Sequence, residues 1–560
     1  MGIDNQVCTV QHHRILLFLA LLLSPAAVAV PAGVSPATRP AGPADTSAWI
    51  GTNYTPAYAA NQVQMWHDFR PDVIGRELAA ARKHFGLTTL RVYLHYVNFR
   101  DEKDKLLARI EQFLALCDKH SIRPGFTFFD DCWNHKDIAL DTPPPVDGRH
   151  NGRWAAVQDA DRKEANLPLF RSYVREIVAT HARDKRVLWW EVYNEPNRKD
   201  PFTRKLCELG YRWARECKPD QPILCCWDDN PQTEIVNAHN YGADFAPGGA
   251  WDRQADLNPA KGTVFTEAGA RWYAGKPSSN GSPIEVVRWL RSRRARNKSV
   301  PGVYLCWELM AGNSHCRWYW GTKDGAPEPP IPWCGLLMPD CTPVSYAEAE
   351  AVRSYATGRP RALLFEDFQS APPPADPPGW RRFPPAGQAG RGYLTLEGSA
   401  KLVAGREQWS DYLLEAAVML KAETGNAGLI FRVSAPGPGH DQMRGYYAGL
   451  DRTTLYLGRM ENNWRELARV DLTKVEPKVQ LGAWNLLRVA ASGGRIRVWL
   501  NPLHDDTRPR IDLTDKDPIA RGAVGLRVHN TTACFDDVVV LPIDVLGETS
   551  TTEDTESTEK

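Results

Sequence analysis

Glu195 and Glu267 are the residues whose surroundings point most directly to chemistry. Each stands at the end of an apolar, strand-like run, the first after residues 187–194 and the second after residues 263–266. If both runs are strands of one parallel barrel, their carboxyl ends open at the same mouth. Two carboxylates that face each other there can split a glycosidic bond, because one protonates the leaving oxygen while the other attacks the sugar carbon.

The elements that must position this pair alternate along residues 48–358. Strand-like runs with amphipathic helical stretches between them predict an α/β fold, a (β/α)8 TIM barrel. We expect one helix from about Asp104 to Lys119 and another from an N-cap at Asp72 to Gly86. The fifth and sixth strands are too close in sequence for more than a stub of helix between them. The expected strands lie near 49–54, 89–94, 123–129, 186–193, 222–227, 235–239, 263–267 and 302–307.

From about residue 363 the pattern changes to short strands with little helical periodicity. Such strands predict an all-β sandwich over residues 360–545. The tail, residues 546–560, is rich in Ser, Thr and acidic residues, a composition typical of disorder. The expected strands include 412–416, 428–432, 455–457, 486–490, 495–500 and 524–528.

The first 29 residues have the form of a signal peptide. Arg14 precedes an apolar run over 15–23, and Ala27-Val28-Ala29 has the small-x-small form of a cleavage site. An uncleaved anchor is the alternative, but the run is shorter than the roughly 20 residues that a spanning helix needs. We therefore predict a secreted or periplasmic protein, with a flexible leader over 30–47 and no membrane contact after cleavage.

Composition excludes some partners. The 68 basic and 67 acidic residues nearly cancel, so there is no electrostatic footprint for nucleic acid. Twenty Trp and 18 Tyr suit a neutral polysaccharide, because aromatic faces pack on sugar rings. Two of Cys316, Cys334 and Cys341 are expected to form a disulfide. No C-x-x-C pair occurs, and we predict a monomer without metal or cofactor.

The tripeptide Asn194-Glu195-Pro196 resembles the acid/base motif of the clan of (β/α)8 glycoside hydrolases that includes the cellulase family. Other motifs of that clan follow in the same order along the chain. They are Arg91 in Thr89-Leu90-Arg91-Val92-Tyr93, His239-Asn240-Tyr241, Glu267 and Trp307. The stretches 51–54, 128–134 and 345–350 are similar to a bacterial branch that is often labelled xylanase.

The resemblance implies a metal-independent, retaining β-glycoside hydrolase of the endo-β-1,4-glycanase type, such as a cellulase, mannanase or xylanase. Glu195 is then the acid/base and Glu267 the nucleophile. Because the acid must begin protonated, we predict that burial and the charge of Glu267 raise the pKa of Glu195 to about 6 to 7. Pro196 is expected to hold the Glu195 backbone extended. Glu191 is expected to lie deeper in the barrel, in a buried ion pair.

The resemblance also assigns supporting roles to residues around this pair. Asn194 is expected to donate to the sugar 2-hydroxyl. Arg91 and Tyr241 are expected to orient Glu267 and keep it ionised. Trp307 looks like the platform beneath the sugar ring, with a core tryptophan as the alternative. For His239, a sugar contact and a hydrogen bond within the protein both stay open.

At the end of the third strand, Asp130, Asp131 and Trp133 are expected to line the glycone side of the site. Trp133 would stack on a further sugar, and a solvated loop acid is the alternative for either aspartate. The segments 141–154 and 312–341 are the ones that decide between cleavage inside a chain and at its end.

The C-terminal motifs at 365–368, 428–432 and 535–538 resemble a laminin-G-like jelly roll of the 3-keto-disaccharide hydrolase type. Two other functions stay open. The chain could be a carbohydrate-binding protein with an inactive barrel, or the sandwich could carry a second hydrolase or lyase activity. For the sandwich itself, sugar binding or packing against the barrel is the simpler expectation.

Overall fold

The structure is a computed structural model that describes residues 44–225, 227, 230–271, 281–369, 376–384 and 392–548. The predicted signal peptide, most of the leader and most of the acidic tail lie outside these residues. Within them, no helix has the length and apolar character needed to cross a bilayer.

Eight parallel strands form the first domain in the order β5-β4-β3-β2-β1-β8-β7-β6. Among the described residues, β5 and β6 at the ends of this order share no ladder, and there the Glu234 amide donates to the Ile223 carbonyl at 3.1 Å. The (β/α)8 barrel predicted from the sequence is confirmed as eight parallel strands that nearly close. Its strands are β1 (Ile50–Tyr54), β2 (Thr89–Tyr93), β3 (Arg123–Asp130), β4 (Trp190–Asn194), β5 (Ile223–Leu224), β6 (Val236–Asn240), β7 (Thr263–Ala268) and β8 (Gly302–Leu305).

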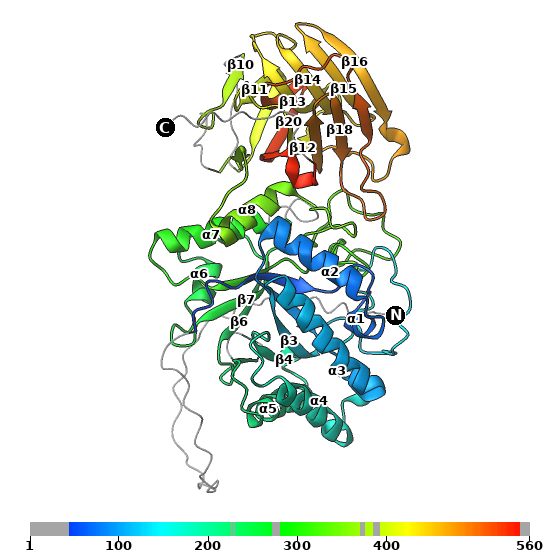
Figure 1. Cartoon of the computed structure of the whole chain (residues 1–560), viewed down its shortest axis with the longest axis vertical. Helices are drawn as coiled ribbons and strands as arrows, with labels where there is room; N and C mark the ends of the chain where they lie inside the picture. Colours follow the sequence, from blue (N-terminus) through cyan, green and yellow to red (C-terminus); the bar gives the residue numbers. More distant parts are fainter. Residues whose placement is uncertain are drawn as a thin grey trace, which may run out of the picture. The chain divides into compact units, whose positions relative to one another are not determined.

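Helices cover the outside of this sheet, and Figure 1 shows α3, α4 and α5 in sequence along it. Between β5 and β6 the described residues contain no helix, in keeping with the short connection in the sequence. The helices are α1 (Gln62–His67), α2 (Pro71–Ala80), α3 (Tyr96–Lys119), α4 (Leu167–Thr180), α5 (Pro201–Glu216), α6 (Ala250–Ala255), α7 (Pro283–Ala295) and α8 (Tyr346–Thr357).

One helix start agrees with the prediction and one differs. α3 has a kink at Glu102, where φ is −147°, so its second segment begins close to the predicted Asp104; a first segment precedes it from Tyr96, where the His95 side chain accepts from the Val97 amide. α2 begins at Pro71, since proline suits the first helical position, and Asp72 lies inside its first turn. The predicted end at Gly86 is confirmed. Gly86 has a φ of +67°, and this left-handed conformation ends the helical segment.

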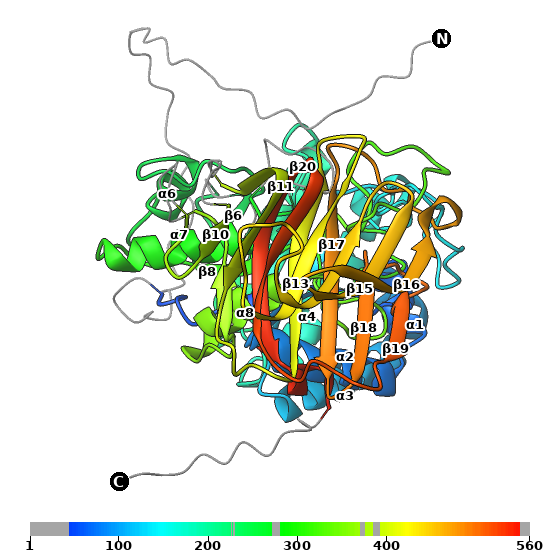
Figure 2. The ribbon, with the colours of Figure 1, turned by 90° about the horizontal axis from the view of Figure 1, so that it is seen from above.

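The second domain is antiparallel, with nine strands in the order β16-β15-β14-β13-β20-β12-β17-β18-β19. Three further strands lie off this path: β9 and β11 pair with β20, and β10 pairs with β11. Figure 2 shows these long strands side by side. β20 joins them, because its first half pairs with β13 and its second half with β12. The strands are β9 (Leu364–Glu366), β10 (Arg381–Phe383), β11 (Leu394–Ala404), β12 (Tyr412–Leu420), β13 (Asn426–Ser434), β14 (Arg444–Leu450), β15 (Thr454–Glu461), β16 (Trp464–Asp471), β17 (Trp484–Ser492), β18 (Arg495–Leu500), β19 (Ile511–Thr514) and β20 (Ala523–Pro542).

The buried Glu415 of β12 contacts the first turn of α8. Its Oε1 accepts from the Ser345 hydroxyl at 3.1 Å and from the Tyr346 amide at 2.7 Å. Its Oε2 accepts from Arg488 Nε at 2.8 Å. A carboxylate is stabilised at this end of a helix by the exposed amides and the helix dipole. Packing between the sandwich and the barrel, one of the expected roles of the sandwich, therefore has a specific polar contact.

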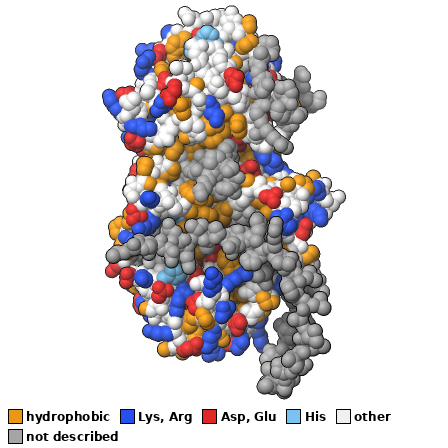
Figure 3. Space-filling view, turned by 180° about the vertical axis from the view of Figure 1, so that it is seen from behind, with side chains coloured by type: hydrophobic (Ala, Val, Ile, Leu, Met, Phe, Trp, Pro, Cys, Tyr) orange, Lys and Arg blue, Asp and Glu red, His pale blue; other side chains and the backbone are white. Residues whose placement is uncertain are grey.

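The predicted disulfide is wrong. Cys316, Cys334 and Cys341 are all free thiols, and Cys334 lies against the thiol of Cys306 in the barrel core. On the molecular surface, basic and acidic side chains are intermingled over the face in Figure 3. That mixture agrees with the balanced charge of the sequence.

Candidate active site

Glu267 lies at the end of β7, and both of its carboxylate oxygens are held. Arg91 donates from Nη1 to Oε1 at 2.8 Å, and the Tyr241 hydroxyl donates to Oε2 at 2.6 Å. Burial raises the pKa of the Tyr241 phenol well above its ordinary value, so the phenol keeps the proton that it donates. The carboxylate is thereby fixed in orientation, with 7% of its side chain exposed.

Glu195 follows β4, and its two oxygens also have separate partners. His239 Nδ1 lies 2.8 Å from Oε1, and the Cys132 thiol donates to Oε2 at 3.0 Å. The expected extended backbone is wrong, because Glu195 has a φ of +40° in the left-handed region. Such a conformation costs on the order of 1–3 kcal/mol and persists only where surrounding contacts enforce it.

The predicted upward shift of the Glu195 pKa is also wrong. Burial alone raises this pKa, but the hydrogen bond and positive charge of His239, with smaller contributions from Cys132 and Arg91, outweigh it and lower the pKa. For His239, burial alone lowers the pKa, and the charges of Glu267 and Glu195 reverse this and raise it. Both shifts favour the shared proton on His239 Nδ1.

His239 has no free ring nitrogen for a sugar. Its Nε2 lies 3.0 Å from the Thr266 hydroxyl, and 6% of its side chain is exposed. Of the two possibilities left open by the sequence, the structure favours the hydrogen bond within the protein. Its Nδ1 also lies 3.6 Å from Glu267 Oε2, so His239 stands between the two carboxylates.

Glu195, His239 and Glu267 each offer an atom within 4.8 Å of the others, a spacing that could also admit a metal ion. However, Arg91 and Tyr241 already donate to both oxygens of Glu267, so a cation there would displace existing hydrogen bonds. The other such group in the described residues is Glu111, His181 and Asp184 on the outside of the barrel, where both acids pair with Arg186.

Arg91 connects the nucleophile candidate to the barrel interior. It donates to both oxygens of Glu191 at 2.7 and 2.8 Å, and to Asn194 Oδ1 at 2.6 Å. Asn53 of β1 accepts from the same guanidinium at 3.2 Å. The expectation that Glu191 forms a buried ion pair is confirmed. Asn194 directly precedes Glu195; its carbonyl oxygen accepts from Arg91, and its amide nitrogen lies 3.8 Å from the Cys132 sulfur.

The two aspartates at the end of β3 accept hydrogen bonds within the protein. Asp130 is buried and accepts from Trp154 Nε1 at 2.8 Å and from the Cys132 amide at 2.6 Å, and burial raises its pKa to about 8. Asp131 accepts from Tyr193 and from the amide of Asn197 after β4. These hydrogen bonds hold the loops around Glu195 in place, and the contact of either aspartate with a sugar stays a prediction.

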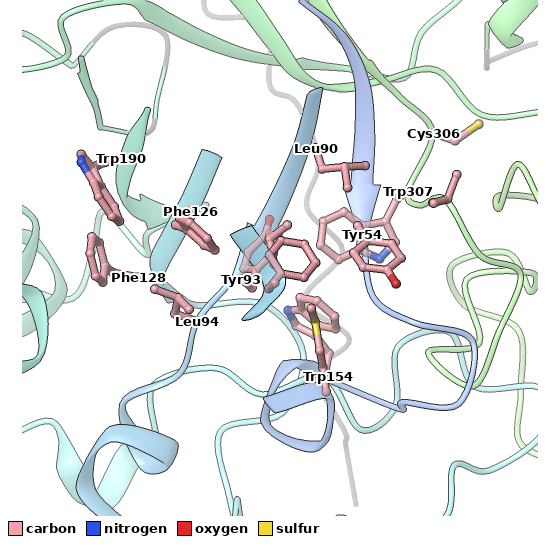
Figure 4. Packing of buried hydrophobic residues seen from close by; sticks show 14 of the residues in the cluster. Tyr54, Leu90, Tyr93, Leu94, Phe126, Phe128, Trp154, Trp190, Cys306 and Trp307 are labelled. Atoms are coloured by element: carbon pink, nitrogen blue, oxygen red, sulfur yellow. The ribbon is translucent and has the colours of Figure 1, made fainter. Parts of the chain in front are cut away.

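Aromatic rings line the same region. Figure 4 shows Trp307 beside Tyr93 and Trp154. Trp307 is 5% exposed, and its ring packs edge-on against those two rings, with centroids 5.4 and 4.9 Å away. Trp133 is 47% exposed, with a φ of +71°. Trp320 packs edge-on against Tyr241 at 4.9 Å.

Four residues near the site carried no role in the sequence prediction. Cys132 and Trp154 were within segments expected at the mouth, but their contacts to Glu195 and Trp307 depend on how the β3 loop folds. Trp320 and Trp333 belong to the β8 loop and pack around Tyr241. The density of tryptophan in that loop was the available signal.

The fold and the site together define a (β/α)8 barrel with a pair of carboxylates at the carboxyl ends of β4 and β7. The model of the 3-keto-alpha-glucoside-1,2-lyase-like domain matches residues 375–541, which lie in the sandwich. A search of curated proteins finds no match.

Among solved structures, an exo-beta-1,4-mannosidase from an Opitutaceae bacterium is 15% identical, covering 55% of this chain and 59% of its own length, with a TM-score of 0.39. A GH5_18 protein from Streptomyces cattleya in complex with GlcNAc is 13% identical over 56% of this chain and 81% of its own, with a TM-score of 0.37. The carbohydrate binding module CBM66 from Bacillus subtilis is 21% identical over 29% and 95%, with a TM-score of 0.23. These values are too low to transfer an activity.

Proposed function

We propose that the chain is a retaining β-glycoside hydrolase that acts outside the cytoplasm on a β-1,4-linked polysaccharide such as cellulose, mannan or xylan. The observation that carries the proposal is the pair Glu195 and Glu267, which offer oxygens within 4.8 Å of each other across one mouth. Retaining glycosidases keep their carboxyl groups about 5–5.5 Å apart, whereas inverting ones leave about 6.5–9.5 Å for a water.

The surroundings suit Glu267 to the nucleophile's task. Arg91 and Tyr241 each donate a hydrogen bond to one oxygen of its carboxylate and so fix its orientation toward the mouth. In the first step Glu267 attacks the anomeric carbon, and the bond to the leaving oxygen breaks. The product of this step is a glycosyl ester on Glu267 and a free leaving group that has taken up one proton.

That proton comes from Glu195 and is supplied to it by His239. The proton on His239 Nδ1 is one hydrogen bond of 2.8 Å from Glu195 Oε1. A sugar that covers Glu195 displaces water and disfavours its charged form, so binding favours transfer of the proton to the carboxylate. In the second step a water attacks the anomeric carbon, loses its proton to Glu195, and frees Glu267.

A second candidate activity lies in the sandwich, and the family match over residues 375–541 favours it. The full-length double variant Glu195→Gln/Glu267→Gln separates the two. We expect it to be inactive on every polysaccharide that the native protein cleaves. Turnover that survives in the double variant would assign the activity to the sandwich.

The proposal is tested by incubating the purified protein with cellulose, mannan, xylan and mixed-linkage glucan and following the products by proton NMR. We expect one of these polymers to yield sugars whose first-formed anomer is β. A first-formed α anomer would mean inversion, and no cleavage of any of them would leave a binding function in its place.

A further inference from the structure

The loops that follow β1, β3 and β8 are joined into one wall along the barrel mouth. Because β3, β2, β1 and β8 are consecutive in the sheet, these loops rise above four neighbouring strands. We call residues 55–61, 142–155 and 312–327 the loop wall. Its contacts and its position relative to Trp307 bear on which part of a polysaccharide can enter.

The β3 and β8 parts of the loop wall are tightly connected. His150 Nδ1 lies 2.8 Å from the Trp318 carbonyl, and the Gly325 amide donates to the Asp147 carbonyl at 2.7 Å. Arg149 and Asp324 form a two-point ion pair at 2.6 and 2.8 Å. The backbones approach so closely that a Cβ at position 148 would collide with the carbonyl of residue 323.

The β1 part connects to both of the others. The Asn313 amide donates to the Ala57 carbonyl at 2.9 Å, and Asn61 Nδ2 donates to the Arg153 carbonyl at 2.7 Å. The wall is therefore continuous across its three loops, with a backbone contact or a side-chain hydrogen bond at each junction.

This wall stands directly against Trp307. The Asn151 amide, with its oxygen toward the indole, accepts from Trp307 Nε1 at 2.7 Å and donates to the Ser314 carbonyl at 3.0 Å. Trp154, also from the β3 loop, packs edge-on against the same indole. If Trp307 supports the sugar that is cleaved, the position for a preceding sugar is filled by these side chains.

Exposure rises in the opposite direction, toward the acid. The Glu267 side chain is 7% exposed and the Glu195 side chain 28%. Trp133, which follows Cys132 in the β3 loop, is 47% exposed, and its ring packs against His150 of the loop wall at 5.2 Å. The more exposed of the two carboxylates is therefore the one that protonates the leaving group.

We propose that the site accepts one sugar on the glycone side, so that the protein removes single sugars from the non-reducing ends of β-1,4-linked chains. This inference rests on the proposed function and replaces the endo-type cleavage that the sequence predicts. The loop wall blocks the glycone side beyond Trp307, and the remainder of the chain leaves past Glu195.

The test uses 4-nitrophenyl β-glycosides of glucose, mannose and xylose, together with the corresponding β-1,4-linked disaccharide glycosides. A site for one glycone sugar must remove the terminal sugar first, so nitrophenol from the disaccharide glycoside should appear only after a lag, preceded by monosaccharide. Immediate nitrophenol with intact disaccharide would overturn the inference. If neither these glycosides nor the polysaccharides are cleaved, the proposed function itself fails.

A substitution in the loop wall tests the same inference by changing the protein instead of the substrate. Trp320 donates from Nε1 to His150 Nε2 at 3.1 Å, so Trp320→Ala removes a ring that connects the β8 and β3 loops. We expect this variant to shorten the lag and to release intact disaccharide. The matched control is Trp464→Ala in the sandwich, which should keep the native product pattern; equal patterns in both variants would count against the wall.

Discussion

Two buried arginines, Arg91 in the barrel and Arg432 in the sandwich, have the same burial and different partners. Arg91 donates to side chains from three strands, among them Glu191 and Glu267. Arg432 donates mainly to backbone carbonyls, those of Ser410, Gly493 and Ile519. Arg432 satisfies backbone carbonyls in the turns of the sandwich, whereas Arg91 holds other ionisable side chains in place in the barrel. Burial of charge alone therefore does not mark a site; convergence of titratable side chains on one point does.

The largest expected effect is on kcat, when a carboxylate of the barrel is removed and compared with removal of a carboxylate of the sandwich. Glu267→Ala removes the proposed nucleophile and should lower kcat by at least about 10⁴-fold, as loss of a nucleophile does in other hydrolases. Added azide should restore cleavage and give a product of inverted configuration. Glu466→Ala, at an exposed glutamate of β16 that pairs with Arg469, is the control and should leave kcat unchanged.

The arginines themselves provide the second comparison. Arg91→Met and Arg432→Met should each lower the free energy of unfolding by about 3–5 kcal/mol, because each leaves buried partners uncompensated. Only Arg91→Met should also lower kcat in the fraction that stays folded. Thermal unfolding and kinetics at low temperature measure the two effects, and an equal loss of kcat in both variants would contradict the distinction.

The third prediction concerns the proton that His239 and Glu195 share. The pKa of His239 is raised above its ordinary value. His239 and Glu195 therefore hold the shared proton at pH values below this pKa, and they lose the proton as the pH rises through it. In His239→Gln the proton depends on Glu195 alone. We expect the alkaline limb of kcat/KM to move to lower pH, with kcat reduced by about 10². An unmoved alkaline limb would mean that His239 does not supply the proton.

The smallest expected effect is at Cys132. Its thiol hydrogen bond contributes to lowering the pKa of Glu195, so Cys132→Ala should raise that pKa. A neutral hydrogen bond contributes about 0.5–1.5 kcal/mol, which corresponds to a change in kcat/KM of no more than about tenfold. Cys132→Ser keeps a donor and should stay close to the native pH profile. The pH dependence of kcat/KM distinguishes the two variants.

Local sequence patterns were sufficient for the barrel strands and for placing Glu195 and Glu267 at strand ends. They also identified Glu191 as a buried partner, since it shares the alternation of Glu195 along β4. The pKa of Glu195 was not predictable in the same way, because it depends on His239 from β6 and Cys132 from the β3 loop. Such contacts are set by the closure of the barrel, which periodicity along one strand does not encode.

The loops show the same limit more strongly. The segments 141–154 and 312–341 were recognised as the ones that control access, but their mutual hydrogen bonds join residues that are far apart in sequence. The free thiols of Cys316 and Cys334 follow from the same cause, because the β8 loop buries them in the barrel core instead of bringing them together.

The most direct test of the account is to trap the covalent intermediate. The protein is incubated with 2-deoxy-2-fluoro-β-glycosyl fluorides of glucose, mannose and xylose and of their β-1,4-linked disaccharides, then digested and analysed by mass spectrometry. We predict one added glycosyl group on the peptide that contains Glu267, and none in Glu267→Ala. A label on Glu195, or turnover of the native substrate through an inverted product with no label, would contradict the assignment of the two carboxylates.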